Sequence, residues 1–247
     1  QLANDGCIYA LPGKATRALR INPAQGTATE FGDDCASLAS GIEFPWHETV
    51  LGGDGKLYGI PLNAPCVLRL DPVTGRATTF GSLEKGGDKY ISGILSPTDG
   101  CIYCPPGRAS RILKIDPQNS TAVCVCDKLE GGGLKYHSGA VAADGNIYCI
   151  PGESAGRVLC IVPGKNPTIS FIGDELPGGW RFHRGFAGSD GCIYGMSLRH
   201  DDEDYRKLLR IDPASNTVAQ VGEKQPYLSK RSMCYGPAVA PDGATYL

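Results

Sequence analysis

The chain of 247 residues is predicted to be an all-β repeat protein, and three observations support this prediction. A phrase of the form Asp-Gly-x-Ile-Tyr, once with Leu in place of Ile, occurs five times, and a partial copy follows near the C-terminus. A segment rich in alternating apolar and polar residues follows each full copy and ends in Pro, as in Arg111–Pro117. The opening Asp residues are separated by 49, 45, 45, 46 and 52 residues, a period typical of propeller blades. The repeats start near Asp5, Asp54, Asp99, Asp144 and Asp190, with the partial copy at Asp242.

Each repeat is predicted to contain four short strands and essentially no helix. Asp-Gly between two apolar runs indicates a tight hairpin turn, because Gly adopts positive φ without steric cost. Ile-Tyr suits a half-buried strand, and the closing Pro ends the next strand because it cannot donate to a ladder. In the third repeat the predicted strands are Ser92–Ser96, Cys101–Cys104, Ile112–Ile115 and Ala122–Cys126.

The strand count favours one domain, residues 1–247, of five four-stranded blades. The first repeat has no inner strand before Cys7–Ala10, and the segment Gly236–Pro241 has no complete blade of its own. We therefore expect the C-terminal strand to join the N-terminal blade and close the ring, which removes an exposed sheet edge. The stub Ala244–Leu247 favours the alternative, a ring of six or seven blades of which this chain is a part.

Composition excludes several classes of protein. The formal net charge is −2, so no field for nucleic acid is predicted, and no apolar run approaches the roughly 20 residues of a membrane span. Among the eleven cysteines, Cys7, Cys101 and Cys192 occupy the same place in three repeats, which matches neither a disulfide framework nor a zinc ligand set. Most cysteines are therefore expected to be small buried residues, and a reducing intracellular compartment is favoured. No metal and no cofactor is predicted.

The repeat Asp-Gly-x-Ile-Tyr followed by Leu-Arg-Ile-Asp-Pro resembles the blades of the propeller group that includes NHL-type, YVTN-type and streptogramin-lyase-like proteins. The resemblance covers nearly the whole chain, which lacks the Trp-Asp dipeptide of WD40 blades and the kelch pattern. It implies the fold and leaves the activity open, because such families include scaffolds, sugar binders and a few enzymes.

Aromatic residues and histidines align just before the predicted inner strands. His47, His137 and His183 share one position of three repeats, on a connection expected to lie near the central channel of a propeller. Two interpretations stay open: a set of imidazoles that binds a metal or an anionic ligand, or a repeated His–carbonyl hydrogen bond beside an aromatic wedge. The other candidate ligand-binding residues are Trp46, Tyr90, Tyr136, Trp180 and Tyr235.

An acidic insertion interrupts the period in the last full repeat. It lengthens a hairpin, and its spacing matches no calcium loop. Because loops carry recognition on rigid scaffolds, it is a candidate partner-contact loop. Its residues are His200, Asp201, Asp202, Glu203 and Asp204.

Three classes of function remain, and a catalytic role is disfavoured because no catalytic constellation stands out. The first is a non-enzymatic binding or scaffold propeller, a protein-interaction module or accessory subunit whose partners are other protein subunits. The second is a carbohydrate-binding propeller, in which aromatic rings stack on sugars. The third is an enzyme of lyase or lactonase type, with a site in the central channel that uses His137 or His183 with a metal.

Overall fold

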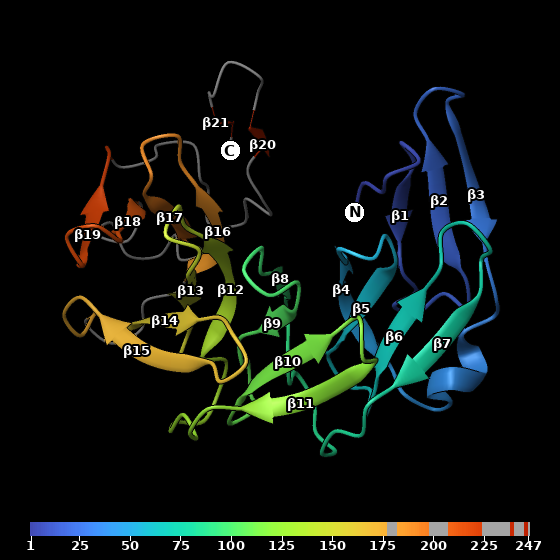
Figure 1. Cartoon of the computed structure of the whole chain (residues 1–247), viewed down its shortest axis with the longest axis horizontal. Coiled ribbons are helices and arrows are strands. Elements are labelled where there is room, and N and C mark those ends of the chain that lie inside the picture. The colour runs from blue at the N-terminus through green and yellow to red at the C-terminus, as the bar shows by residue number, and fades with distance from the viewer. Residues whose placement is uncertain (177–181, 198–206, 224–237, 240–244, 247) are drawn as a thin grey trace. The chain divides into compact units, whose positions relative to one another are not determined.

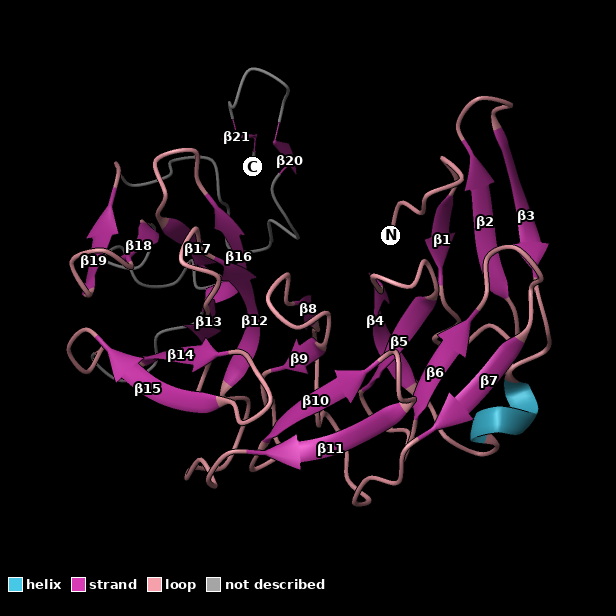
Figure 2. Ribbon diagram, in the orientation of Figure 1, coloured by secondary structure: helices cyan, strands magenta, loops and turns pink. Residues whose placement is uncertain are grey.

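The computed structural model describes residues 1–176, 182–197, 207–223, 238–239 and 245–246. In this part of the chain the secondary structure is almost entirely antiparallel β-sheet, with one short helical turn (Figure 2). The chain separates into two compact units, Gln1–Leu129 and Glu130–Leu247, and each is described by itself. The single domain predicted from the repeats therefore stays a prediction.

The N-terminal unit contains three sheets, each with its strands paired in chain order (Figure 1). The first sheet has three strands, β1 (Ile8–Ala10), β2 (Ala18–Asn22) and β3 (Thr27–Phe31). The second has four, β4 (Trp46–Leu51), β5 (Leu57–Pro61), β6 (Val67–Leu70) and β7 (Ala77–Phe80). The third also has four, β8 (Ile94–Leu95), β9 (Ile102–Cys104), β10 (Ile112–Asp116) and β11 (Thr121–Val125). The helical turn, Ala36–Ala39, lies in the connection between the first two sheets.

The C-terminal unit contains two four-stranded sheets and one short hairpin. The first sheet comprises β12 (Tyr136–Val141), β13 (Ile147–Pro151), β14 (Val158–Val162) and β15 (Thr168–Ile172). The second comprises β16 (Phe182–Ala187), β17 (Ile193–Ser197), β18 (Leu208–Asp212) and β19 (Thr217–Val221). The hairpin consists of β20 (Ala238–Val239) and β21 (Thr245–Tyr246).

These sheets confirm the predicted all-β fold of four-stranded repeats, with one difference at the start. Leu2 forms a β-bridge with Ile8, and the backbone N–H of Tyr9 donates to the carbonyl of Gln1 at 2.8 Å. The first residues of the chain therefore lie along the edge of β1 that faces away from β2. Of the segment Gly236–Pro241, the structure describes only the two residues of β20, which pair with β21. Closure of the ring stays a prediction, as does the number of blades.

The recurrent Asp-Gly-x-Ile-Tyr phrase forms a hydrogen-bonded clamp within its own hairpin. In the third repeat, Asp99 Oδ1 accepts from the backbone N–H of Cys101 at 3.2 Å, and Asp99 Oδ2 accepts from the Tyr103 hydroxyl at 2.8 Å. Gly100 at the turn has φ +68°, which favours glycine. The same Tyr–Asp hydrogen bond of 2.7–2.8 Å recurs in the other four full copies. The phrase therefore fixes the turn to the strand that follows it, and the spacing of four residues between Asp and Tyr permits this hydrogen bond.

In the four-stranded sheets, the strand that follows the Asp-Gly turn lies between two other strands. All five residues of β5 and of β13 are buried, as expected for strands covered on both faces. Seven of the ten described cysteines are buried and all ten are free thiols, which confirms their expected role as small core residues. Among the described residues, no helix is long and apolar enough to cross a membrane.

Acid is expected to destabilise the fold by protonating aspartates that accept hydrogen bonds, such as Asp99 in the clamp and Asp71 in the turn after β6. Burial alone would raise the pKa of Asp99, but hydrogen bonds from Lys114, Tyr103 and the Cys101 backbone hold this pKa below its usual value. Backbone N–H groups, first that of Val73, likewise lower the pKa of Asp71. The stabilisation from a carboxylate with a lowered pKa is complete above its unfolded value of about 4 and is lost as the pH falls through the folded value. Urea denaturation at a series of pH values should therefore give a free energy of unfolding that falls below about pH 4. A value independent of pH in that range would contradict the clamp.

Candidate functional site

Three of the aromatic residues predicted to bind ligand, Trp46, Tyr90 and Tyr136, lie inside the blades. The Trp46 indole Nε1–H donates to the carbonyl of Cys66 at 3.0 Å, one residue before β6. The hydroxyl of Tyr90 donates to the carbonyl of Arg111 at 3.1 Å, one residue before β10. Tyr136 lies at the corresponding position of the next repeat, and all three side chains are only 2–3% exposed. These aromatic residues tie the start of the inner strand to the start of the third strand and present no open face to a sugar. Their predicted contact with a ligand stays untested.

A conservative replacement of Tyr136 should isolate the value of this hydrogen bond. Its hydroxyl donates to the carbonyl of Arg157 at 3.2 Å, one residue before β14. Tyr136→Phe keeps the buried ring, and Phe182 already occupies the same position in the next blade, so a loss of about 1 kcal/mol is expected. Tyr136→Ala also leaves a cavity and should cost about 4 kcal/mol by urea denaturation. Equal losses for the two variants would show that the ring itself does not pack as described.

The histidine column is divided between the two units. In the N-terminal unit, His47 is exposed and its Nδ1 lies 3.0 Å from the carbonyl oxygen of Ile91. This contact is the His–carbonyl hydrogen bond that one of the two interpretations predicts. In the C-terminal unit, the rings of His137 and His183 lie side by side, with centroids 5.0 Å apart and planes inclined by 45°.

Irregular strand pairing explains how these histidines are presented. The register shifts between Trp46 and Thr49 in β4 and between Phe182 and Gly185 in β16, so each histidine sits at a bulge. A bulge turns side chains away from the regular alternation of the pleat. One residue further on, Ser138 Oγ accepts from the backbone N–H of Gly185 at 2.9 Å and joins the two inner strands. Ligand binding by these histidines stays a prediction. Trp180, Tyr235 and the acidic loop from His200 to Asp204 lie outside the described residues.

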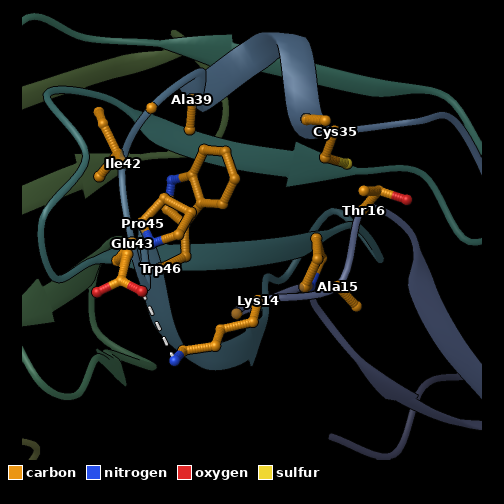
Figure 3. A pocket seen from close by; sticks show the side chains of 13 residues that line it. Lys14, Ala15, Thr16, Cys35, Ala39, Ile42, Glu43, Pro45 and Trp46 are labelled. Carbon is orange, nitrogen blue, oxygen red and sulfur yellow. Dashed lines mark ion pairs between the residues drawn. The ribbon is translucent and has the colours of Figure 1, made fainter.

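A small cavity of about 330 Å³ lies between the loop that joins β1 to β2 and the connection between the first two sheets (Figure 3). The indole of Trp46 forms one wall, and Lys14 and Glu43 extend across the cavity toward each other, with Nζ and Oε1 3.7 Å apart. Lys14 Nζ also lies 4.5 Å from the centroid of the Phe44 ring. Because Lys14 and Glu43 are well exposed, their ion pair is worth at most about 1 kcal/mol.

A larger groove of about 820 Å³ lies in the connection between the second and third sheets. It is formed by the connection 82–90, the loop 108–111, strand β11 and Lys128, and it is called the basic groove below. Its charged lining consists of Lys85, Lys89, Arg108, Arg111 and Lys128, with Glu84 as the one acidic residue.

Lys89 lies at the base of the basic groove. Its side chain is 6% exposed, and Nζ donates to the carbonyl of Gly86 at 3.1 Å. Burial lowers the pKa of Lys89, more than the nearby Cys66 thiol raises it. Lys89 is not among the site residues predicted from the sequence. A Lys-Tyr dipeptide before the inner strand is its sequence signal, and the equivalent lysine, Lys135, is also buried.

No family model matches the chain, and the comparison with curated proteins gives no match. Several solved structures are similar to it. A catalytically inactive variant of virginiamycin B lyase from Staphylococcus aureus, with a histidine changed to alanine and solved with quinupristin, superposes with a TM-score of 0.68 at 13% identity, over 89% of this chain and 67% of the other. A streptogramin B lyase gives 0.69 at 14% identity, over 99% and 79% of the two chains. Hydrazine synthase of Kuenenia stuttgartiensis gives 0.63 at 15% identity, over 98% and 70%. Together with the four-stranded sheets, these similarities establish that the chain has the propeller-type fold of the streptogramin lyases.

Proposed function

We propose that this protein is a non-enzymatic binding propeller, a protein-interaction module that acts as a subunit of a larger assembly. One observation carries the proposal: the repeated polar residues hold the strands of each blade together, whereas about half or more of the lining of both cavities comes from the connections between blades, whose sequences differ. The Tyr–Asp clamps and the aromatic–carbonyl bonds recur from blade to blade. The connection 35–46 lines the small cavity together with the loop 12–16, and the connection 82–90 lines the basic groove together with the loop 108–111 and β11.

Stable blades joined by connections of different sequence suit the recognition of a partner. A scaffold of paired strands fixes the positions of its loops, and loops that differ between blades can bind one partner in one orientation. A fold shared with lyases does not assign their chemistry to this chain, because unrelated functions use the same propeller.

Selection of peptides tests the proposal. Immobilised protein is offered a random peptide library, and the binding of selected peptides is then mapped by hydrogen exchange of the complex. Protection is expected in the connections 35–46 or 82–90, with the clamped hairpins unchanged. Failure to select any peptide above a blank surface, or protection confined to the inner strands, would reject the interaction module.

A lyase-type enzyme is the second candidate, because the His137 and His183 rings are 5.0 Å apart on adjacent inner strands. One similar structure is a lyase inactivated by replacement of a histidine. Incubation with quinupristin followed by mass spectrometry tests this candidate, with His137→Ala/His183→Ala as the control and metal content measured for both. Turnover by the wild-type protein that the double variant lacks would replace the interaction module by an enzyme.

A further inference from the structure

The basic groove contains more positively charged side chains than nearby carboxylates that could neutralise them. Arg108 pairs with Asp88, with Nε and Oδ2 3.2 Å apart, and both side chains are about half exposed. Arg111 Nη1 donates to a neutral carbonyl, that of Cys126, at 3.1 Å. Within the part of the chain that the structure describes, no carboxylate lies within ion-pair distance of Lys85 or Lys128. Because the whole chain has a net charge of −2, this positive charge is a local property of the groove.

Apolar surface separates these charges. Leu83 and Ala109 line the groove and pack against the core of the unit, and Val123 in β11 is 50% exposed. β11 is the outermost strand of its sheet, in the order β11-β10-β9-β8. An outermost strand presents backbone N–H and C=O groups along which an extended chain can lie.

We propose that the basic groove binds an acidic peptide segment of a partner protein, with apolar side chains placed between its carboxylates. This inference rests on the proposed function, since it names the chemistry of the partner.

Three features favour a peptide over other anions. The groove, at about 820 Å³, is large for an inorganic anion and lies in the upper part of the usual range for ligand sites. Its apolar residues would be left uncovered by phosphate alone. The one aromatic ring in its lining, Tyr90, is 2% exposed and its hydroxyl is bonded to the Arg111 carbonyl, so it offers no stacking face for a sugar.

The expected binding is salt-dependent, because Lys85, Arg108 and Lys128 are exposed and pairs between exposed charges are screened by salt. A fluorescein-labelled peptide with the repeated sequence Glu-Leu-Glu-Gly is the probe, and fluorescence polarisation gives its dissociation constant at about 50 mM and about 200 mM NaCl. The same peptide with Gln in place of Glu is the control ligand. We expect the Glu peptide to bind more tightly than the Gln peptide and to lose affinity as the salt concentration rises.

Variants of exposed residues locate the binding. Lys85→Glu/Lys128→Glu should weaken binding of the Glu peptide by about tenfold. Arg76→Glu/Lys165→Glu changes the net charge equally at exposed positions outside the groove and should leave the affinity unchanged. Unaltered thermal unfolding of both variants would show that they fold.

Equal binding to the two double variants, or equal binding of the Glu and Gln peptides, would overturn the inference. Binding of tripolyphosphate in the groove without binding of the Glu peptide would also overturn it, in favour of a simple anion site. If peptides selected from a random library bind the protein but are neutral or protect only the connection 35–46, the interaction module survives and the acidic partner does not. If no peptide binds, both fail.

Discussion

Replacement of Asp99 by alanine is expected to lower the free energy of unfolding by about 3 kcal/mol. Asp99 Oδ2 accepts from the Tyr103 hydroxyl at 2.8 Å and pairs with Lys114 Nζ at 2.9 Å, where the two charged side chains are only 17% and 13% exposed. Removal of the carboxylate leaves a mostly buried ammonium group without its counter-charge, which costs more than loss of the hydrogen bonds alone. Urea denaturation followed by circular dichroism measures this difference.

The fourth repeat provides a matched control for this variant. Asp144 accepts from the Tyr148 hydroxyl at 2.8 Å in the same way. The residue opposite Tyr148 on the neighbouring strand is Cys160, whereas the residue opposite Tyr103 is Lys114. Asp144→Ala removes hydrogen bonds only and should cost about 1.5 kcal/mol. The double variant Asp99→Ala/Lys114→Met should be more stable than Asp99→Ala, because the uncompensated charge is gone. Equal losses for Asp99→Ala and Asp144→Ala would show that the ion pair contributes nothing.

Replacement of Trp46 by alanine should cost about 4 kcal/mol. The indole is 3% exposed and donates to the Cys66 carbonyl at 3.0 Å, and its buried neighbours Cys35, Ala64 and Leu68 are too small to refill the space. Trp46→Phe keeps part of the ring volume and loses the hydrogen bond, so about 2 kcal/mol is expected for it.

The same denaturation experiment separates a structural Trp46 from a ligand-binding one. A structural role predicts that Trp46→Ala unfolds at a much lower urea concentration than Trp46→Phe. A loss below about 1 kcal/mol for Trp46→Ala would indicate instead that the indole is dispensable for folding and free to serve a ligand.

Strand positions were predictable from the sequence because they depend on neighbours along the chain. In the third repeat, Cys101–Cys104 and Ile112–Ile115 were predicted, and the observed strands are Ile102–Cys104 and Ile112–Asp116. The Asp-Gly turn and the alternation of apolar residues fix these limits locally. The sequence also indicated the His–carbonyl bond as one interpretation, which His47 and Ile91 form.

The candidate sites were less predictable because they join residues that the repeat does not relate. Ser82 and Lys128 line one groove although they are 46 positions apart in the sequence, and Lys89 is buried beside Tyr90. The sequence pattern alone suggested that the aromatic residues before the inner strands form a ligand-binding surface. Only the hydrogen bonds of Trp46 and Tyr90 to carbonyl groups about 20 residues away reveal its structural role.

The sequence by itself determined the repeated hairpins, since a turn and an alternating strand are set by residues within a few positions of one another. Only the tertiary structure shows which aromatic rings are buried, that His137 and His183 are in contact, and that several Lys and Arg side chains line one groove. Those properties depend on the burial of each side chain and on distances between residues far apart in the chain, and a linear pattern contains neither.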